Sequence, residues 1–207
     1  GVAECTVKPT WNGCDAATLV AALEGLVLPM LRDRDLDDPG ALVEPLRRLV
    51  ENSAAKALLE NAQADLAGLS AAAPVPVSWT LTRDRPARMA EEAAEMVGRY
   101  GFGVLKIKGG QGLAVDLEAI GEVRRAVGDG LSFYVDTNGA HPEADAVAYV
   151  TALQDAGAVA LEDPYNLKPD DRLSRVQDSL RVPLVVDFSL DGVSSARTFL
   201  ERGARGL

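Results

Sequence analysis

The stretch GVLKIKGGQGLAVDLEAIGEVRRAVGDGLSFYVDTN, residues 103–138, contains one complete strand–helix–strand unit and decides the fold. Residues 103–108 form a short apolar run that is typical of a strand, and residues 131–138 form a second one. Between them, residues 113–128 carry apolar side chains at helical spacing. A strand, a helix and a strand in this order predict a βαβ unit with parallel strands.

The same alternation continues on both sides of this unit. Further strands are predicted at residues 77–81, 158–164 and 182–188, and further helices at residues 85–101, 142–157, 170–180 and 193–203. Residues 204–207 are expected to begin one more strand. Each unit takes about 25 residues, which suits either a (β/α)8 barrel or a doubly wound parallel sheet. Five strands and the start of a sixth fall short of the eight that a closed barrel needs.

The first 74 residues have a different, helical pattern. Helices are predicted over residues 15–31, 37–52 and 53–69, followed by a loop over residues 70–78. Asp15 is a good N-cap for the first helix, whose last turn Pro29 is expected to disturb. Residues 1–9 look like the end of a strand.

Composition excludes several classes of function. The chain has 207 residues, enough for one large domain or two small ones, and a net charge of −10, which argues against a nucleic-acid surface. It has no apolar run of about 18 residues, so no membrane span is expected. Cys5 and Cys14 fit no zinc spacing, and two cysteines in such a chain favour free thiols in a reducing compartment, the cytoplasm.

Charged side chains gather where successive predicted strands end. Lys106 and Lys108 are two residues apart on one strand, so they point to the same face. Asp136, Glu162 and Asp187 follow on the next strands, 26 and 25 residues apart, and are expected at one level of the sheet. Three bare carboxylates would repel one another, and Mg²⁺, which takes oxygen ligands, removes that repulsion. The alternative is that they are ordinary strand-end acids that cap the next helices.

These motifs resemble the enolase superfamily, in its muconate-lactonizing and mandelate-racemase-like branches. KIK on the second barrel strand, DTN on the third, EDP on the fourth and VVDFS on the fifth match that family in order and spacing. The resemblance implies an α/β fold: a partial (β/α)8-type, TIM-like barrel at residues 75–207, preceded at residues 1–74 by the mainly helical part of an α+β capping domain. It also implies a chain that is incomplete at both ends.

The resemblance implies an isomerase or lyase with Mg²⁺ as cofactor and a small-molecule carboxylate as substrate. The shared reaction removes the proton α to a carboxylate and gives an enediolate, in racemases, epimerases, cycloisomerases and dehydratases. The implied site residues are Asp136, Glu162 and Asp187 as Mg²⁺ ligands, Lys106 and Lys108 as catalytic lysines, and Asn138 and Trp11 as residues that bind substrate or orient these groups. Lys108 would be the general acid/base, and Lys106, a neighbouring cation near the substrate carboxylate, favours its uncharged form.

The sequence departs from the family pattern in three places, of which the change to Ala64-Asp65 in the pre-barrel helix, where the family usually has Trp-Asp, concerns packing alone. Phe188 follows Asp187 where many members have glutamate, and no residue up to Leu207 supplies the acid/base of the opposite face. Activity is therefore expected to need the C-terminal barrel half, and open sheet edges favour a homo-oligomer. One alternative is a non-catalytic or truncated pseudoenzyme fragment of the same fold. Another is an open-sheet phosphate- or nucleotide-binding protein using KGGQG at residues 108–112, which lacks the Walker spacing. His141 is expected to be an exposed loop residue.

Overall fold

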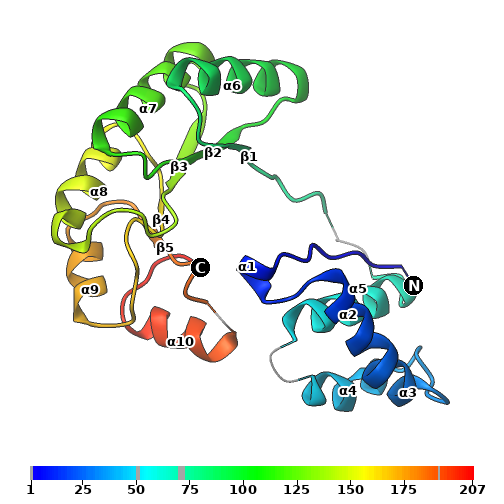
Figure 1. Ribbon diagram of the computed structural model, residues 1–207. Coiled ribbons are helices and arrows are strands. Elements are labelled where there is room, and N and C mark those ends of the chain that lie inside the picture. The colour runs from blue at the N-terminus through cyan, green and yellow to red at the C-terminus, as the bar shows by residue number, and fades with distance from the viewer. Residues whose placement is uncertain (1, 50–51, 70–72, 191) are drawn as a thin grey trace. The chain divides into compact units, whose positions relative to one another are not determined.

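The computed structural model describes residues 2–49, 52–69, 73–190 and 192–207. The chain divides into two compact units, Gly1–Val75 and Pro76–Leu207 (Figure 1). The first unit is helical, and the second alternates strands with helices.

The second unit is built on a parallel sheet. Its strands are β1 (Trp79–Leu81), β2 (Val104–Lys108), β3 (Ser132–Asp136), β4 (Leu161–Glu162) and β5 (Leu184–Val185). They lie in chain order, and every neighbouring pair is parallel. A doubly wound sheet reverses its strand order at a switch point, whereas a barrel adds each strand beside the previous one. The sequential order therefore confirms the prediction of a partial (β/α)8-type barrel.

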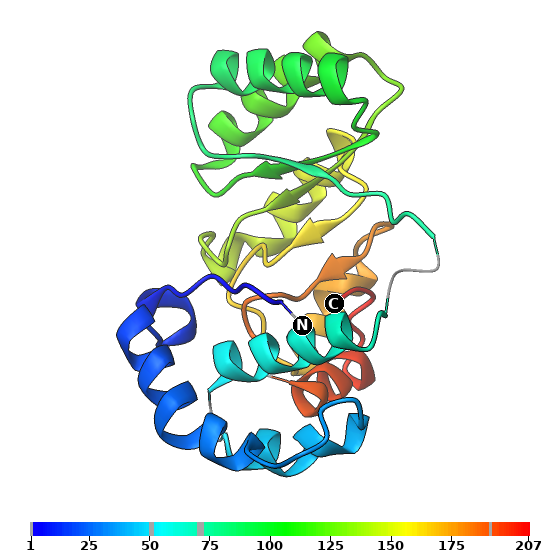
Figure 2. The ribbon, with the colours of Figure 1, turned by 90° about the vertical axis from the view of Figure 1, so that its right-hand side faces the viewer.

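A helix follows each strand and packs along one side of the sheet, as Figures 1 and 2 show. These helices are α6 (Pro86–Tyr100), α7 (Leu113–Val127), the 3-10 turn η3 (Glu143–Asp145) with α8 (Ala146–Asp155), α9 (Asp171–Asp178) and α10 (Val193–Glu201). In α6, Pro86 stands in the first turn, and Gly101, with φ of 71°, ends the helix in the left-handed conformation. Its Met89 and Ala93 join the buried core between helices and strands.

Strand residues alternate between the helix-covered face and the opposite face of the sheet. Leu105 and Ile107 are buried in the core, while Lys106 and Lys108 are half-buried. Because successive strand residues point to opposite faces, both lysines lie on the face away from the helices. Lys106 and Lys108 thus share the face of the sheet opposite to the buried core between strands and helices.

The last two predicted strands are shorter than the sequence pattern suggests. Of residues 158–164 and 182–188, only Leu161–Glu162 and Leu184–Val185 form strands. The expected sixth strand begins as a single parallel bridge between Val185 and Gly206.

The first unit packs its helices around a small core. The helices are α1 (Pro9–Asn12), α2 (Ala16–Ala22), the π-helical η1 (Leu23–Val27), α3 (Leu28–Leu31), the 3-10 turn η2 (Pro39–Leu42), α4 (Val43–Arg48) and α5 (Ser53–Leu66). Asp15 caps α2, because its carboxylate accepts a hydrogen bond from the Thr18 N–H at 2.7 Å. One buried cluster consists of Cys14, Leu19, Val27, Leu49, Ala54 and Ala55, and Ala41 and Leu42 are also buried.

Two predictions for this unit need correction. The predicted helix over residues 37–52 begins as a 3-10 turn at Pro39 and ends at Arg48, while residues 50 and 51 lie outside the described part of the chain. Residues 2–8 form no strand, and the Val2 N–H instead donates to the Asp65 carboxylate at 2.8 Å. The disturbance expected near Pro29 is present, as a π-helical turn directly before α3. Within the described ranges, no helix is long and apolar enough to cross a membrane.

Candidate active site

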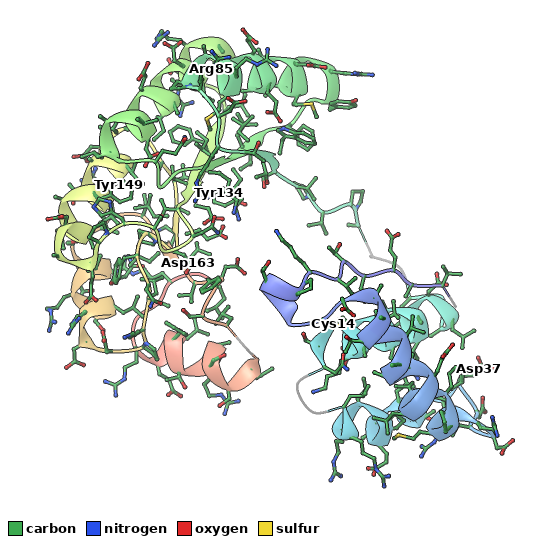
Figure 3. All side chains as sticks on the ribbon, in the orientation of Figure 1. Cys14, Asp37, Arg85, Tyr134, Tyr149 and Asp163 are labelled. Atoms are coloured by element: carbon green, nitrogen blue, oxygen red, sulfur yellow. The ribbon has the colours of Figure 1, made fainter. Side chains whose placement is uncertain are left out.

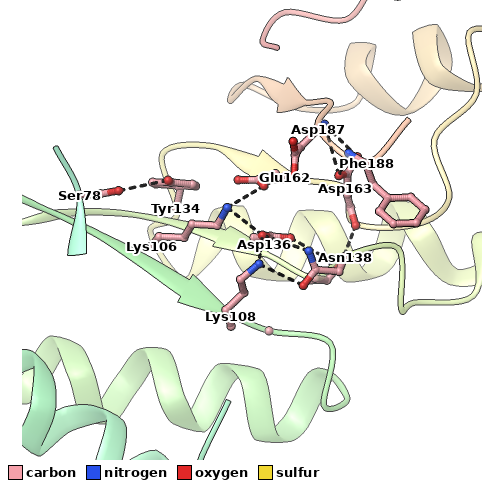
Figure 4. A network of polar contacts seen from close by, with 12 residues as sticks. Ser78, Lys106, Lys108, Tyr134, Asp136, Asn138, Glu162, Asp163, Asp187 and Phe188 are labelled. Atoms are coloured by element: carbon pink, nitrogen blue, oxygen red, sulfur yellow. Dashed lines mark hydrogen bonds and ion pairs between the residues drawn. The ribbon is translucent and has the colours of Figure 1, made fainter. Parts of the chain in front are cut away.

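The strand ends bring both lysines against carboxylates of the next two strands. The register sets Lys108 opposite Asp136, and Asp136 opposite Glu162. Lys106 Nζ lies 2.8 Å from Asp136 Oδ2 and donates to Glu162 Oε1 at 2.7 Å. Lys108 Nζ donates to the same Asp136 Oδ2 (Figure 4). Asp136 is therefore a shared counter-ion that makes two cations on one strand face tolerable.

Burial and ion pairing compete at these groups. Asp136 is 0% exposed. Burial by itself would raise its pKa, but the hydrogen bonds from Lys106 and Lys108 hold the pKa of Asp136 below its usual value. For Lys106, burial would lower the pKa, and the bonds to Asp136 and Glu162 outweigh it, so the pKa of Lys106 is raised. In this state Lys106 is held as a cation.

Asn138 connects Lys108 to the loops around it. Its side-chain oxygen accepts from Lys108 Nζ at 3.1 Å, and its N–H donates to Asp136 Oδ1 at 2.9 Å. Arg83, in the loop after β1, donates to the same Asn138 oxygen at 3.2 Å and to the Thr137 carbonyl at 3.0 Å. The expectation that Asn138 orients a lysine fits these contacts. Sequence reasoning did not find Arg83, because nothing in its spacing relates it to Asn138.

A cluster of three acids lies at the ends of β4 and β5. Glu162, Asp163 and Asp187 each offer a carboxylate oxygen within 4.8 Å of the others. Glu162 and Asp163 are buried, and Asp187 is exposed. Burial raises the pKa of Glu162 to about 7, with Lys106 opposing and Asp136 adding to the rise. Burial likewise raises the pKa of Asp163.

The donor set suits a hard divalent cation. Carboxylate oxygens are the ligands that Mg²⁺ prefers, and close carboxylates need a cation to balance their charge. Of the predicted ligands, Glu162 and Asp187 belong to this cluster, whereas Asp136 is engaged by the lysines. The metal role of Asp136 stays a prediction. Sequence reasoning did not single out Asp163, whose carboxylate oxygen lies within 4.8 Å of those of Glu162 and Asp187.

Two cavities border the cluster, and different members of it line each one. One, of about 440 Å³, is lined by Lys106, Tyr134, Ala160, Glu162, Val185, Asp187 and Leu207. The other, of about 230 Å³, is lined by Asn138, Gly139, Asp163, Tyr165, Asn166, Leu167, Phe188 and Ser189. Phe188 is 76% exposed, so the apolar ring that follows Asp187 is not part of the core. The positions of Tyr134 and Asp163 in the molecule are marked in Figure 3.

The loop after β2 forms hydrogen bonds with a buried side chain of the protein itself. The N–H groups of Gly110 and Gln111 donate to the carboxylate of buried Asp116, at 2.9 and 3.2 Å. Tyr149 donates its hydroxyl to the same carboxylate at 2.6 Å. These two N–H groups therefore do not face a phosphate.

Two smaller expectations have different outcomes. The expectation of an exposed His141 is wrong, because its ring is half-buried and stacks on Tyr149 with centroids 4.0 Å apart. Aromatic stacking removes ring area from water and explains the burial. The side chain of Trp11, a predicted pocket residue, lies outside the described residues.

Comparison with protein families gives this arrangement its context. A family model described as "Enolase C-terminal domain-like" matches residues 88–207, which is more than half of the chain. The chain belongs to the enolase superfamily. The resemblance read from the KIK, DTN, EDP and VVDFS motifs is thereby confirmed for the superfamily and its mandelate racemase/muconate-lactonizing branch.

Individual members of the superfamily align over nearly all of this chain. Chloromuconate cycloisomerase CbnB of Cupriavidus necator is 30% identical over 204 residues, which cover 91% of this chain and 55% of the relative. The chain thus spans about half the length of the curated relatives it matches. Those relatives are isomerase-type enzymes.

Solved structures of the superfamily show the same fold. A muconate lactonizing enzyme from Mycobacterium smegmatis, complexed with muconolactone, has a TM-score of 0.88 at 24% identity, covering 98% of this chain and 59% of that one. A dipeptide epimerase from Enterococcus faecalis V583, complexed with Mg and the dipeptide L-Leu-L-Tyr, has a TM-score of 0.80 at 26% identity, covering 98% and 60%.

Proposed function

We propose that this chain carries the lysine face of an enolase-superfamily active site, which removes the proton α to a carboxylate with the help of Mg²⁺. The product of that step is an enediolate. Racemases, epimerases, cycloisomerases and dehydratases share this step and differ in how the enediolate then reacts. The observation that carries the proposal is the geometry of Lys106 and Lys108. Both Nζ atoms lie at the carboxyl end of β2, in contact with acids of β3 and β4.

The two lysines suit different tasks. Lys108 is 25% exposed and held by Asn138 at 3.1 Å, so its amine can be aimed at a substrate carbon. Lys106 is 17% exposed, lies deeper among the acids and is kept charged by them, so it is suited to balance a substrate carboxylate. A general base must reach its proton within about 3 Å or through one water, which puts the reacting carbon beside Lys108.

The metal part of the proposal assigns Mg²⁺ to Asp136, Glu162 and Asp187. A bound cation would supply positive charge that stabilises carboxylate oxygens as negative charge builds up on them. The oxygen-only donor set and the closeness of Glu162 to Asp187 support this assignment. The dipeptide epimerase complex, described with Mg, lends it further support.

The substrate class follows from the relatives and is also a proposal. The names of two relatives, chloromuconate cycloisomerase and dipeptide epimerase, refer to molecules that carry a carboxylate. We propose a small carboxylate as the substrate of this chain, and a homo-oligomeric assembly.

The decisive experiment is exchange of the α-proton for deuterium. The chain is incubated in D₂O with Mg²⁺ and a panel of muconolactones, hydrophobic dipeptides and N-acyl amino acids, and incorporation is followed by mass spectrometry. Exchange needs one base on one face, so the readout does not depend on a second acid/base group. Lys108→Met should abolish incorporation, whereas Lys168→Met, at an exposed lysine after β4, should leave it unchanged.

Absence of deuterium incorporation across this panel, with Mg²⁺ bound, both in this chain and in a version extended past Leu207, would contradict the catalytic proposal. The pseudoenzyme alternative would then be favoured. Incorporation that survives Lys108→Met would instead show that another group removes the proton.

A further inference from the structure

Asp163 has no part in the proposed reaction, yet its side chain and backbone form hydrogen bonds with neighbouring strand ends. Its Oδ2 accepts the Phe188 N–H at 2.7 Å and the Asp187 N–H at 3.3 Å (Figure 4). Both donors belong to the segment directly after β5. The buried carboxylate, 2% exposed, therefore holds the backbone on which the exposed Asp187 side chain stands.

The backbone of Asp163 joins the neighbouring strand ends as well. Its carbonyl accepts from Thr137 Oγ1 and from the Gly139 N–H, each at 2.7 Å, and its own N–H donates to the Val185 carbonyl at 3.0 Å. Its φ of 40° lies in the left-handed region, which costs free energy for most residues and is best tolerated by Gly, Asn and Asp. Such a conformation persists where surrounding contacts hold it, and those contacts are these hydrogen bonds.

The position of Asp163 relative to the cavities separates two possible roles. Glu162 and Asp187 line the cavity that Lys106 also lines. Asp163 lines the other cavity, with Asn138 and Phe188. A carboxylate that accepts the Asp187 and Phe188 N–H groups, and lines a different cavity from Glu162 and Asp187, is placed to orient a ligand more than to be one.

We propose that Asp163 is a positioning residue, which holds Asp187 beside Glu162 for a divalent cation and does not bind the cation itself. This inference rests on the proposed function, which assigns the cation to the carboxylates of that side. Residues that orient metal ligands typically contribute about 10- to 100-fold in metal affinity.

Three variants of the full chain test it by calorimetric titration with Mg²⁺. Asp163→Asn keeps an acceptor oxygen for the Phe188 N–H, and Asp163→Gly removes it; both residues accept the positive φ. Asp187→Asn serves as the reference for loss of a ligand. We expect Kd within about threefold of the unchanged chain for Asp163→Asn, and about 10- to 100-fold weaker binding for Asp163→Gly.

Amide hydrogen exchange of the metal-free chain gives an independent readout. The Phe188 N–H should exchange faster in Asp163→Gly and at the original rate in Asp163→Asn, since only the first loses the acceptor. If Asp163→Gly does not fold, the comparison of Asp163→Asn with Asp187→Asn still decides between positioning and ligation.

Each remaining outcome overturns the proposal in a distinct way. Mg²⁺ binding as weak in Asp163→Asn as in Asp187→Asn would make Asp163 a ligand. Unchanged affinity in a folded Asp163→Gly would reduce it to a structural residue. A starting chain that binds no Mg²⁺ would refute the metal assignment in the proposed function, and this inference with it.

Discussion

Glu162 should couple Mg²⁺ binding to the release of a proton near neutral pH. Burial, only partly offset by Lys106, raises its pKa from 4.5 to about 7. A cation ligated by Glu162 requires the deprotonated carboxylate, so binding competes with the proton. A single group with a pKa of about 7 weakens affinity about 11-fold at pH 6 and about twofold at pH 7, relative to high pH. The Kd should therefore fall about fivefold between pH 6 and 7, and about twofold between pH 7 and 8.

The same rise in pKa has a consequence for stability without metal. A carboxyl whose folded-state pKa is raised stabilises the folded chain while it is protonated. That contribution is complete below about pH 4.5 and is lost as the pH rises through 7. Asp136, whose pKa is lowered, loses its contribution only below its ordinary value of 3.8, so the two windows do not overlap.

Calorimetric titration at pH 6, 7 and 8 measures the effect. Repeating each titration in two buffers of different ionisation enthalpy counts the protons released. Glu162→Gln is the matched control, in which any remaining binding should lose this pH dependence. A Kd that stays constant from pH 6 to 8, or binding that releases no proton at pH 6, would refute the reasoning about Glu162.

The remaining predictions concern single side chains. Asp116→Ala removes the acceptor of three hydrogen bonds and should lower the free energy of unfolding by about 2–4 kcal/mol in urea, whereas Asp129→Ala, fully exposed, should change it by less than about 0.5 kcal/mol. Ile107→Ala empties core volume and should cost about 2–5 kcal/mol, with half-exposed Val159→Ala as its control. Phe188→Glu adds a negative charge at an exposed position next to Asp187, so Mg²⁺ affinity should rise severalfold at unchanged stability. An unchanged affinity would show that a charge at position 188 does not affect the metal site.

Local patterns were sufficient for most of the barrel part. Alternating strand and helix patterns predicted every strand from β1 to β5, since short apolar runs and helical spacing report local burial. The shortening of β4 and β5 could not be read in the same way, because pairing depends on the neighbouring strand. The correction at residues 37–52 concerns the length of a helix. Pro39 and Pro45 are compatible with the first turn of a helix, but they do not fix how far the helix extends, and α4 ends at Arg48.

The sequence by itself determined that Lys106, Lys108, Asp136, Glu162 and Asp187 stand at successive strand ends, because βα spacing and the two-residue period of a strand are local properties. Only the tertiary structure decided how these charges are shared. In the structure, Asp136 forms ion pairs with both lysines, and Asp163 accepts hydrogen bonds from the backbone N–H groups of Asp187 and Phe188. Hydrogen bonds between strand ends depend on register and on the backbone angles of the loops, and neither is encoded in the spacing of residues along the chain.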